Sequence, residues 1–97
     1  MLRHIVIWKF KDSADKAAHI AKAKAALLSY AGLTPGIVQF EVATPQEGLT
    51  FTYDLMLNSA FTDRAALQAY QTHPDHVAIK PFMSEVVAER QCMDYEI

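Results

Sequence analysis

Apolar residues recur along the chain with two different spacings, one typical of strands and one typical of helices. Short runs rich in β-branched and aromatic residues, with apolar and polar positions in alternation, predict four strands. These runs cover residues 5–10 with His4 at their head, 37–44, 51–61 and 86–97. The segments between them have the 3.6-residue spacing of helices or the glycine and proline content of turns.

The first predicted helix begins at Ala14 and ends near Gly32. Glycine commonly caps the end of a helix, and Pro35 cannot continue one. The apolar positions that fall on one stripe of this helix, and are therefore predicted to be buried, are Ala14, Ala18, Ala21, Ala25 and Leu28.

The second predicted helix starts with Thr62 or Asp63 as its N-cap and ends at His73. Pro74 disfavours the helical conformation in the residue before it, so the helix must stop there. Proline is also well suited to a first helical position, so Pro74 can open a new short helix through Ile79.

The resulting order, β-α-β-β-α-β, predicts an α+β, ferredoxin-like fold with a four-stranded antiparallel sheet. Two helices can cover only one face of such a sheet, and the other face should be polar in a monomer. That second face instead mixes polar with apolar residues, which predicts a dimer stacked sheet to sheet. The apolar residues assigned to it are Val6, Trp8, Val38, Phe40 and Met56.

Composition narrows the class of protein. The 97 residues suit a single domain, residues 1–97, and the apolar fraction of 52% excludes disorder. A net charge of −2 does not favour nucleic acid or a membrane surface as a partner. No run is long enough for a membrane span, Met1 leads directly into a strand, and the single Cys92 fits a reducing cytoplasm.

The segment "AYQTHPDHV" from Ala69 to Val77 gathers most of the candidate chemistry. His73 and His76 have a spacing that can place two imidazoles on one helix face, but Pro74 separates them and no further ligands are evident. We therefore predict no metal and no cofactor. A histidine near its ordinary pKa can instead act as a general base if another group orients it.

His76 is the candidate base, and Tyr70 can fold back toward it from the preceding helix. His4, at the head of the first strand, can point into the same cavity. The alternatives stay open at this stage: Tyr70 and His76 can be core residues, His73 can satisfy the backbone at the helix break, and His4 can be an exposed strand end. Phe51 and Leu55 can form the apolar wall, and His73 is a further candidate pocket residue.

Four stretches that are spread over nearly the whole chain are "HIVIWKFK", "PGI", the run "YDLMLNSAFTDRAALQAYQTHPDHV" and the final "MDYEI". In these stretches the chain resembles the stress-responsive α/β-barrel (Dabb) domain family. The resemblance implies a homodimer whose two sheets close an α+β barrel. The family includes plant stress proteins, so a stress-related role with a small apolar or aromatic ligand is one expectation.

The family also looks similar to plant polyketide cyclases, which implies a second expectation. There a histidine that matches His76 acts as the base in ring closure, a tyrosine that matches Tyr70 assists, and a histidine that matches His4 lines the cavity. Another pocket histidine is replaced here by Tyr53. The expectations are thus a ligand-binding homodimer of unassigned activity, or a cofactor-free cyclase or isomerase. A heme-degrading monooxygenase is a third alternative.

Overall fold

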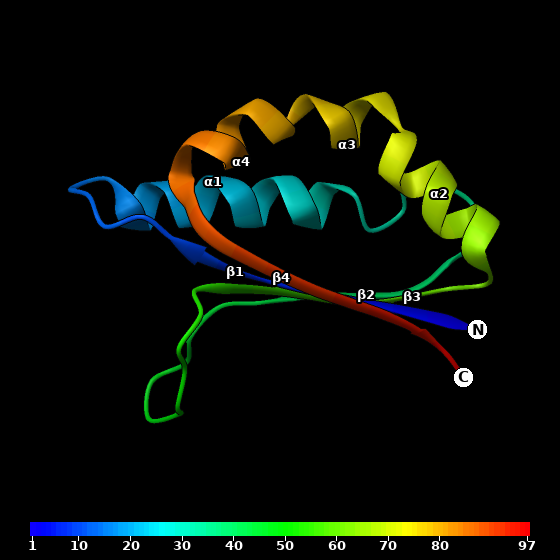
Figure 1. Ribbon diagram of the computed structural model, residues 1–97, viewed down its shortest axis with the longest axis horizontal. Helices are drawn as coiled ribbons and strands as arrows, with labels where there is room; N and C mark the ends of the chain where they lie inside the picture. Colours follow the sequence, from blue (N-terminus) through cyan, green and yellow to red (C-terminus); the bar gives the residue numbers. More distant parts are fainter.

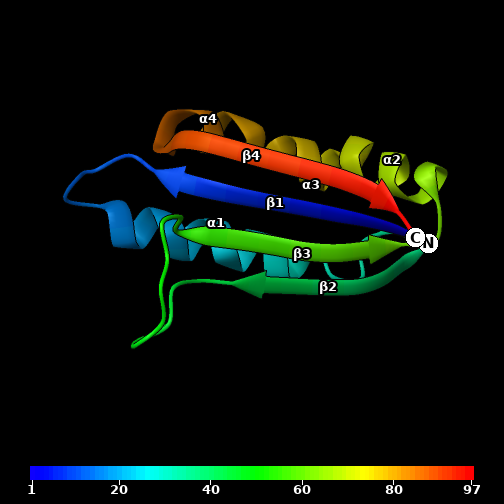
Figure 2. The same cartoon turned by 60° about the horizontal axis from the view of Figure 1, so that its bottom comes forward.

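The four strands form one antiparallel sheet in the order β2-β3-β1-β4 (Figure 2). The computed structural model describes residues 1–97. The elements are β1 (Leu2–Phe10), α1 (Lys16–Ser29), β2 (Ile37–Ala43), β3 (Leu55–Phe61), α2 (Arg64–Thr72), α3 (Pro74–Ala78), α4 (Lys80–Val86) and β4 (Val87–Glu96). All four helices lie on one side of the sheet (Figure 1). This is the predicted α+β, ferredoxin-like arrangement. None of the helices has the length and apolar composition of a membrane span.

β1 alternates between the two faces of the sheet, as its sequence predicts. Val6, Trp8 and Phe10 are buried, and Ile5 and Ile7 between them are only half-buried. The buried set faces the helices and joins one core cluster. Alternation shows which residues share a face, but it does not show which face the helices cover.

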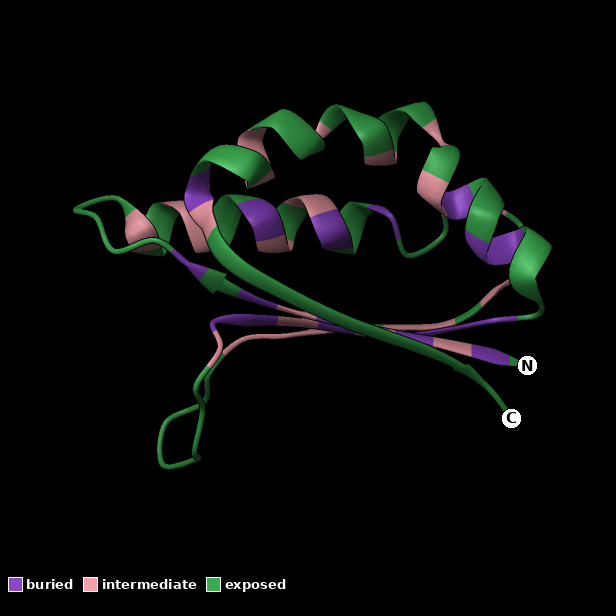
Figure 3. Cartoon of the chain, viewed as in Figure 1, coloured by how far each residue is buried: buried purple, intermediate pink, exposed green.

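The composition predicted for the uncovered face was therefore wrong in part. Val6 and Trp8 lie under the helices, and Phe40 packs against the same core. Met56 does lie on the uncovered face, opposite Ile7 of β1. The apolar or aromatic side chains that the pairing places on this face are Ile5, Ile7, Met56, Met93 and Tyr95. Figure 3 shows that β4, which carries two of them, is exposed along nearly its whole length.

The buried face of α1 also differs from the prediction. Its buried residues are Ala23 and Leu27, whereas the predicted stripe from Ala14 to Leu28 is exposed. Alanines occupy every side of this helix, so their spacing does not single out one face. The larger side chains decide it, because Leu27 loses more apolar surface to the core than any alanine can.

β3 begins four residues later than predicted, at Leu55. Phe51 and Tyr53 lie in the connection before it, and Phe51 is exposed. Asp54 ends this connection as a buried carboxylate that accepts the backbone N–H of Phe10 at 2.8 Å. The hydrogen bond ties the start of β3 to the end of β1.

Proline and capping residues set the helix boundaries on the other side. The Asp63 side chain caps α2 by accepting the N–H of Ala66 at 2.8 Å. His73 is extended, with φ −61° and ψ 137°, and Pro74 opens α3 as predicted. A further helix, α4, was not predicted, because the short helix was expected to end at Ile79 and to lead directly into the last strand. Pro81 instead lies in the first turn of α4, where a missing N–H costs nothing.

Gly36 fixes how α2 approaches the start of β2. Its φ of 91° lies in the left-handed region, and a Cβ there would come within 2.6 Å of the Ala66 Cβ. Its carbonyl accepts the N–H of Thr62 at 2.9 Å. The close approach positions the helix that carries Tyr70.

Candidate functional site

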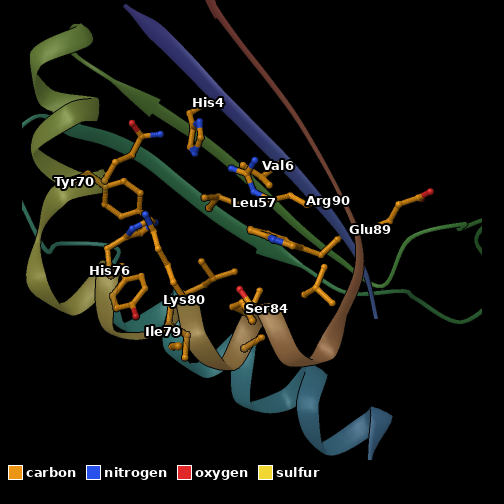
Figure 4. Close-up of a pocket in the computed structure, with 18 of the residues that line it drawn as sticks. His4, Val6, Leu57, Tyr70, His76, Ile79, Lys80, Ser84, Glu89 and Arg90 are labelled. Carbon is orange, nitrogen blue, oxygen red and sulfur yellow. The ribbon is translucent and has the colours of Figure 1, made fainter. Parts of the chain in front are cut away.

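A cavity of about 780 Å³ lies between the sheet and the helices (Figure 4). Its floor is formed by β1, β3 and β4, and its walls by α1, α2, α3 and α4. Apolar side chains make up much of the lining, among them Trp8, Leu57, Ile79, Met83 and Val87. This volume is within the range of pockets that hold small organic molecules.

The helix break at Pro74 brings Tyr70 and His76 together. Their ring centroids are 4.7 Å apart, and the Tyr30 ring lies 6.0 Å from that of His76. Tyr30 donates a hydrogen bond to the backbone carbonyl of Asp75 at 2.9 Å. Three aromatic rings, at the C-cap of α1, on α2 and on α3, therefore form one end of the cavity.

Two polar atoms at this end have no hydrogen-bond partner. They are the Tyr70 hydroxyl and Nδ1 of His76, and both are buried. Leaving a buried polar group unpaired costs about 1–3 kcal/mol. The fold thus keeps two unsatisfied groups side by side at the cavity wall.

Burial also sets the protonation of this pair. It lowers the pKa of His76 below its ordinary value, and the nearby Lys80 cation lowers it further. A hydrogen bond with the Gln71 backbone raises the pKa of His76, while the charges of His4 and Arg90 lower it by smaller amounts. Burial raises the pKa of the Tyr70 phenol. At neutral pH the imidazole is a neutral proton acceptor, and the phenol is a protonated donor.

His4 lines the same cavity from β1, and a carboxylate orients it. Its Nδ1 lies 2.5 Å from Oδ1 of Asp94 on the neighbouring strand β4. An ionised Asp94 can only accept, so the imidazole donates through Nδ1. His4 is almost completely buried, and its carbonyl accepts the hydroxyl of Ser59.

The other predicted pocket residues lie elsewhere. Phe51 and Tyr53 belong to the connection before β3 and do not line the cavity. Tyr53 donates to the carboxylate of Glu89 at 2.8 Å. Leu55 is a core residue that does not line the cavity. His73 accepts the N–H of Asp75 at 3.1 Å and caps α3, which agrees with the predicted backbone role. Phe51 and Tyr53 were predicted to lie in the third strand, but β3 begins four residues later, at Leu55.

A model of the stress-responsive A/B barrel domain family matches residues 2–97. The chain belongs to the Dabb family. No curated protein sequence matches it. Among solved structures, this Dabb chain is similar to a dimeric protein of unknown function with a ferredoxin-like fold from Bacteroides fragilis. That protein is 28% identical, the TM-score is 0.85, and the alignment covers 99% of this chain and 95% of the other.

Two further structures extend the comparison. A Dabb family protein from Mesorhizobium loti is 26% identical, with a TM-score of 0.71 and coverage of 99% and 95%. A cofactor-independent oxygenase from Streptomyces nogalater is 9% identical, with a TM-score of 0.75 and coverage of 99% and 91%. At that identity the likeness concerns the fold alone.

One group of side chains in this Dabb chain has metal-ligand chemistry. His4, Cys92 and Asp94 place their ligand atoms within 4.8 Å of one another. No sequence motif reveals this set, because the residues come from opposite ends of the chain. The 2.5 Å contact between His4 and Asp94 is a hydrogen-bond distance. Two ligands of a tetrahedral zinc ion would be roughly 3.3 Å apart, so an ion requires these side chains to move.

Sequence reasoning missed several residues at this site. Asp94 orients His4, Tyr30 packs beside His76, and Lys80 and Arg90 line the cavity. Trp8 lines it as well, although we assigned it to the opposite face of the sheet. The one available signal was the alternation of β1, since it places His4, Val6 and Trp8 on the same face.

Proposed function

We propose that this Dabb protein is a homodimer in which each subunit binds a small, largely apolar molecule in the cavity between the sheet and the helices. The observation that carries the proposal is the pair of unpartnered buried atoms on Tyr70 and His76. A molecule with one hydrogen-bond acceptor and one donor would satisfy both. The apolar lining would hold the rest of it.

The dimer is supported by the uncovered sheet face. Met93 is 67% exposed and Tyr95 38% exposed, and both lie on this face beside the half-buried Ile5 and Ile7. Large apolar side chains that are exposed together on one face indicate a protein interface. The related Bacteroides fragilis protein is described as dimeric.

Binding can be followed through Trp8, which is the only tryptophan and lines the cavity. A panel of small aromatic and aliphatic ketones, amides and acids is titrated while Trp8 emission and thermal unfolding are recorded. We expect a saturable change in emission and a rise in Tm for at least one class. Tyr70→Phe should weaken this binding but leave the unliganded Tm unchanged or higher, since it removes an unsatisfied hydroxyl.

A second candidate function is cofactor-free enolisation, as in a cyclase or isomerase. Its specific support is the protonation state of the pair: a neutral His76 can take a proton from carbon, and a protonated Tyr70 can donate to the carbonyl oxygen that becomes an enolate. A C–H bond breaks, the proton passes to the imidazole, and the electron pair moves onto oxygen.

Exchange of the protons beside the carbonyl of benzylacetone for deuterium, followed by NMR in D₂O, tests this activity without knowledge of the substrate. We expect the protein to accelerate exchange and His76→Ala to lower the rate about 10²–10⁴-fold. Tyr70→Phe should lower it less. Binding without accelerated exchange, in the wild-type protein, would reject the enzyme and leave the ligand-binding proposal in place.

A further inference from the structure

The charged side chains that line the cavity are unevenly balanced. Lys80 and Arg90 line it, and neither is part of an ion pair. The acidic residue in the lining, Glu89, is occupied elsewhere, because it accepts from the Tyr53 hydroxyl at 2.8 Å and lies 3.9 Å from Nζ of Lys9. The cavity therefore has two cations and no available carboxylate.

The two cations act on the same end of the cavity. In Figure 4 Lys80 extends from α4 along the side of His76, and Arg90 reaches in from β4 toward His4 and Val6, whereas Glu89 points away. Both cations contribute to the lowered pKa of His76, which places their fields at the buried pair. Two positive charges around an apolar cavity attract an anion and repel a cation.

We propose that the ligand of this cavity is an organic acid: a small molecule with an apolar body and a carboxylate held by Lys80 and Arg90. The planar guanidinium of Arg90 suits the two carboxylate oxygens, and Lys80 adds a point charge. The apolar body lies against Trp8 and Met83, and the remaining polar group of the acid reaches Tyr70 and His76. This inference rests on the proposed ligand-binding function and specifies its substrate class.

A matched pair of probes separates charge from shape. Phenylbutyrate and phenylbutyramide have nearly the same size, and only the first is an anion at neutral pH. Each is titrated into the intact protein, with Trp8 emission and calorimetry as readouts. We expect the acid to bind about tenfold more tightly than the amide, and increasing salt to reduce this preference.

Removing each charge in turn tests whether Lys80 and Arg90 cause the preference for the acid. Lys80→Gln and Arg90→Gln should each weaken binding of the acid about 3- to 10-fold while the amide changes less than about 2-fold. Lys11→Gln is the matched control, since Lys11 is exposed, outside the cavity lining and in no ion pair, and the variant loses the same charge. Lys80→Glu should abolish the preference, because the new carboxylate offsets the charge of Arg90.

The outcomes distinguish this inference from the function on which it rests. Equal affinity for acid and amide in the wild-type protein rejects the organic acid and keeps the ligand site. An acid preference that survives in both Gln variants also rejects it, because the charge that selects the acid then lies elsewhere. Failure of every probe in the panel to bind rejects the ligand-binding function itself, and this inference with it.

Discussion

Consecutive side chains of β1 lie on opposite faces of the same sheet, and their surroundings differ. Val6 is 1% exposed beneath the helices, whereas Ile5 and Ile7 beside it are only partly covered. The covered face also contains polar groups that no protein atom satisfies, on Tyr70 and His76. The helix-covered face thus encloses a cavity with two unsatisfied polar groups, and the uncovered face leaves apolar side chains partly exposed. A ligand would complete the first, and a second subunit the second.

The largest expected effect compares neighbouring residues of β3 that point to opposite faces. Leu55 is 2% exposed in the core, and Met56 is partly exposed on the uncovered face. Leu55→Ala should lower the free energy of unfolding by about 2–5 kcal/mol. At protein concentrations low enough to keep the chain monomeric, Met56→Ala should cost less than about 1 kcal/mol. Urea denaturation measures both, and equal losses would contradict the asymmetry.

The second prediction targets the uncovered face directly. Met93→Lys should dissociate the proposed dimer, because an interface of roughly 2,000 Å² cannot bury an unpaired ammonium without a large cost. Sedimentation velocity should then show the 10.9 kDa chain instead of twice that mass. Leu28→Lys is the control, since Leu28 is 51% exposed on α1 and receives the same new charge. A Leu28→Lys monomer beside a Met93→Lys dimer would place the interface on the helices.

A smaller loss of stability is expected from changes at His73, the residue before Pro74. His73 caps α3 by accepting the N–H of Asp75, so His73→Ala should cost about 1 kcal/mol of stability. His73→Asn keeps a capping acceptor and should recover most of that loss. Neither variant should alter ligand binding, because His73 does not line the cavity. Thermal unfolding and the Trp8 titration together make this measurement.

The smallest expected effect is a pH dependence from His76. Its pKa in the folded protein is lowered, so the unfolded chain binds a proton more readily as the pH falls below the ordinary value of about 6.5. The contribution to stability is complete above that pH and is lost as the pH falls from there through the folded pKa. His76→Gln should reduce this slope in urea unfolding series. An unchanged slope would show that other groups produce it.

The sequence was sufficient where a local rule applied. The alternation of β1, the cap at Asp63 and the break before Pro74 were all predicted correctly, because each depends on residues next to one another. The same rules failed where the local sequence fits two structures. Alanines on every side of α1 do not show which face is buried, and Pro81 can either end a helix or lie in its first turn.

The site was predicted only as far as one segment could show it. Tyr70 and His76 lie close in sequence, and their convergence follows from the bend between them. The contact between His4 and Asp94 joins residues 90 positions apart, and no periodicity encodes it. The position of Lys80 depends on α4, which was not predicted, and the position of Arg90 depends on how β4 pairs with β1. The positive charge of the cavity could therefore not be predicted from the sequence without the fold.

Gly36 lies outside the cavity, yet it limits how the cavity can be redesigned. Any side chain at this position would collide with Ala66 and push α2 away from the sheet. Tyr70 would move with that helix, while His4 would stay on its strand. A mutational library intended to change ligand preference should therefore hold residue 36 constant, although no ligand touches it. Variants at this position would otherwise be scored as changes in recognition when they are changes in helix placement.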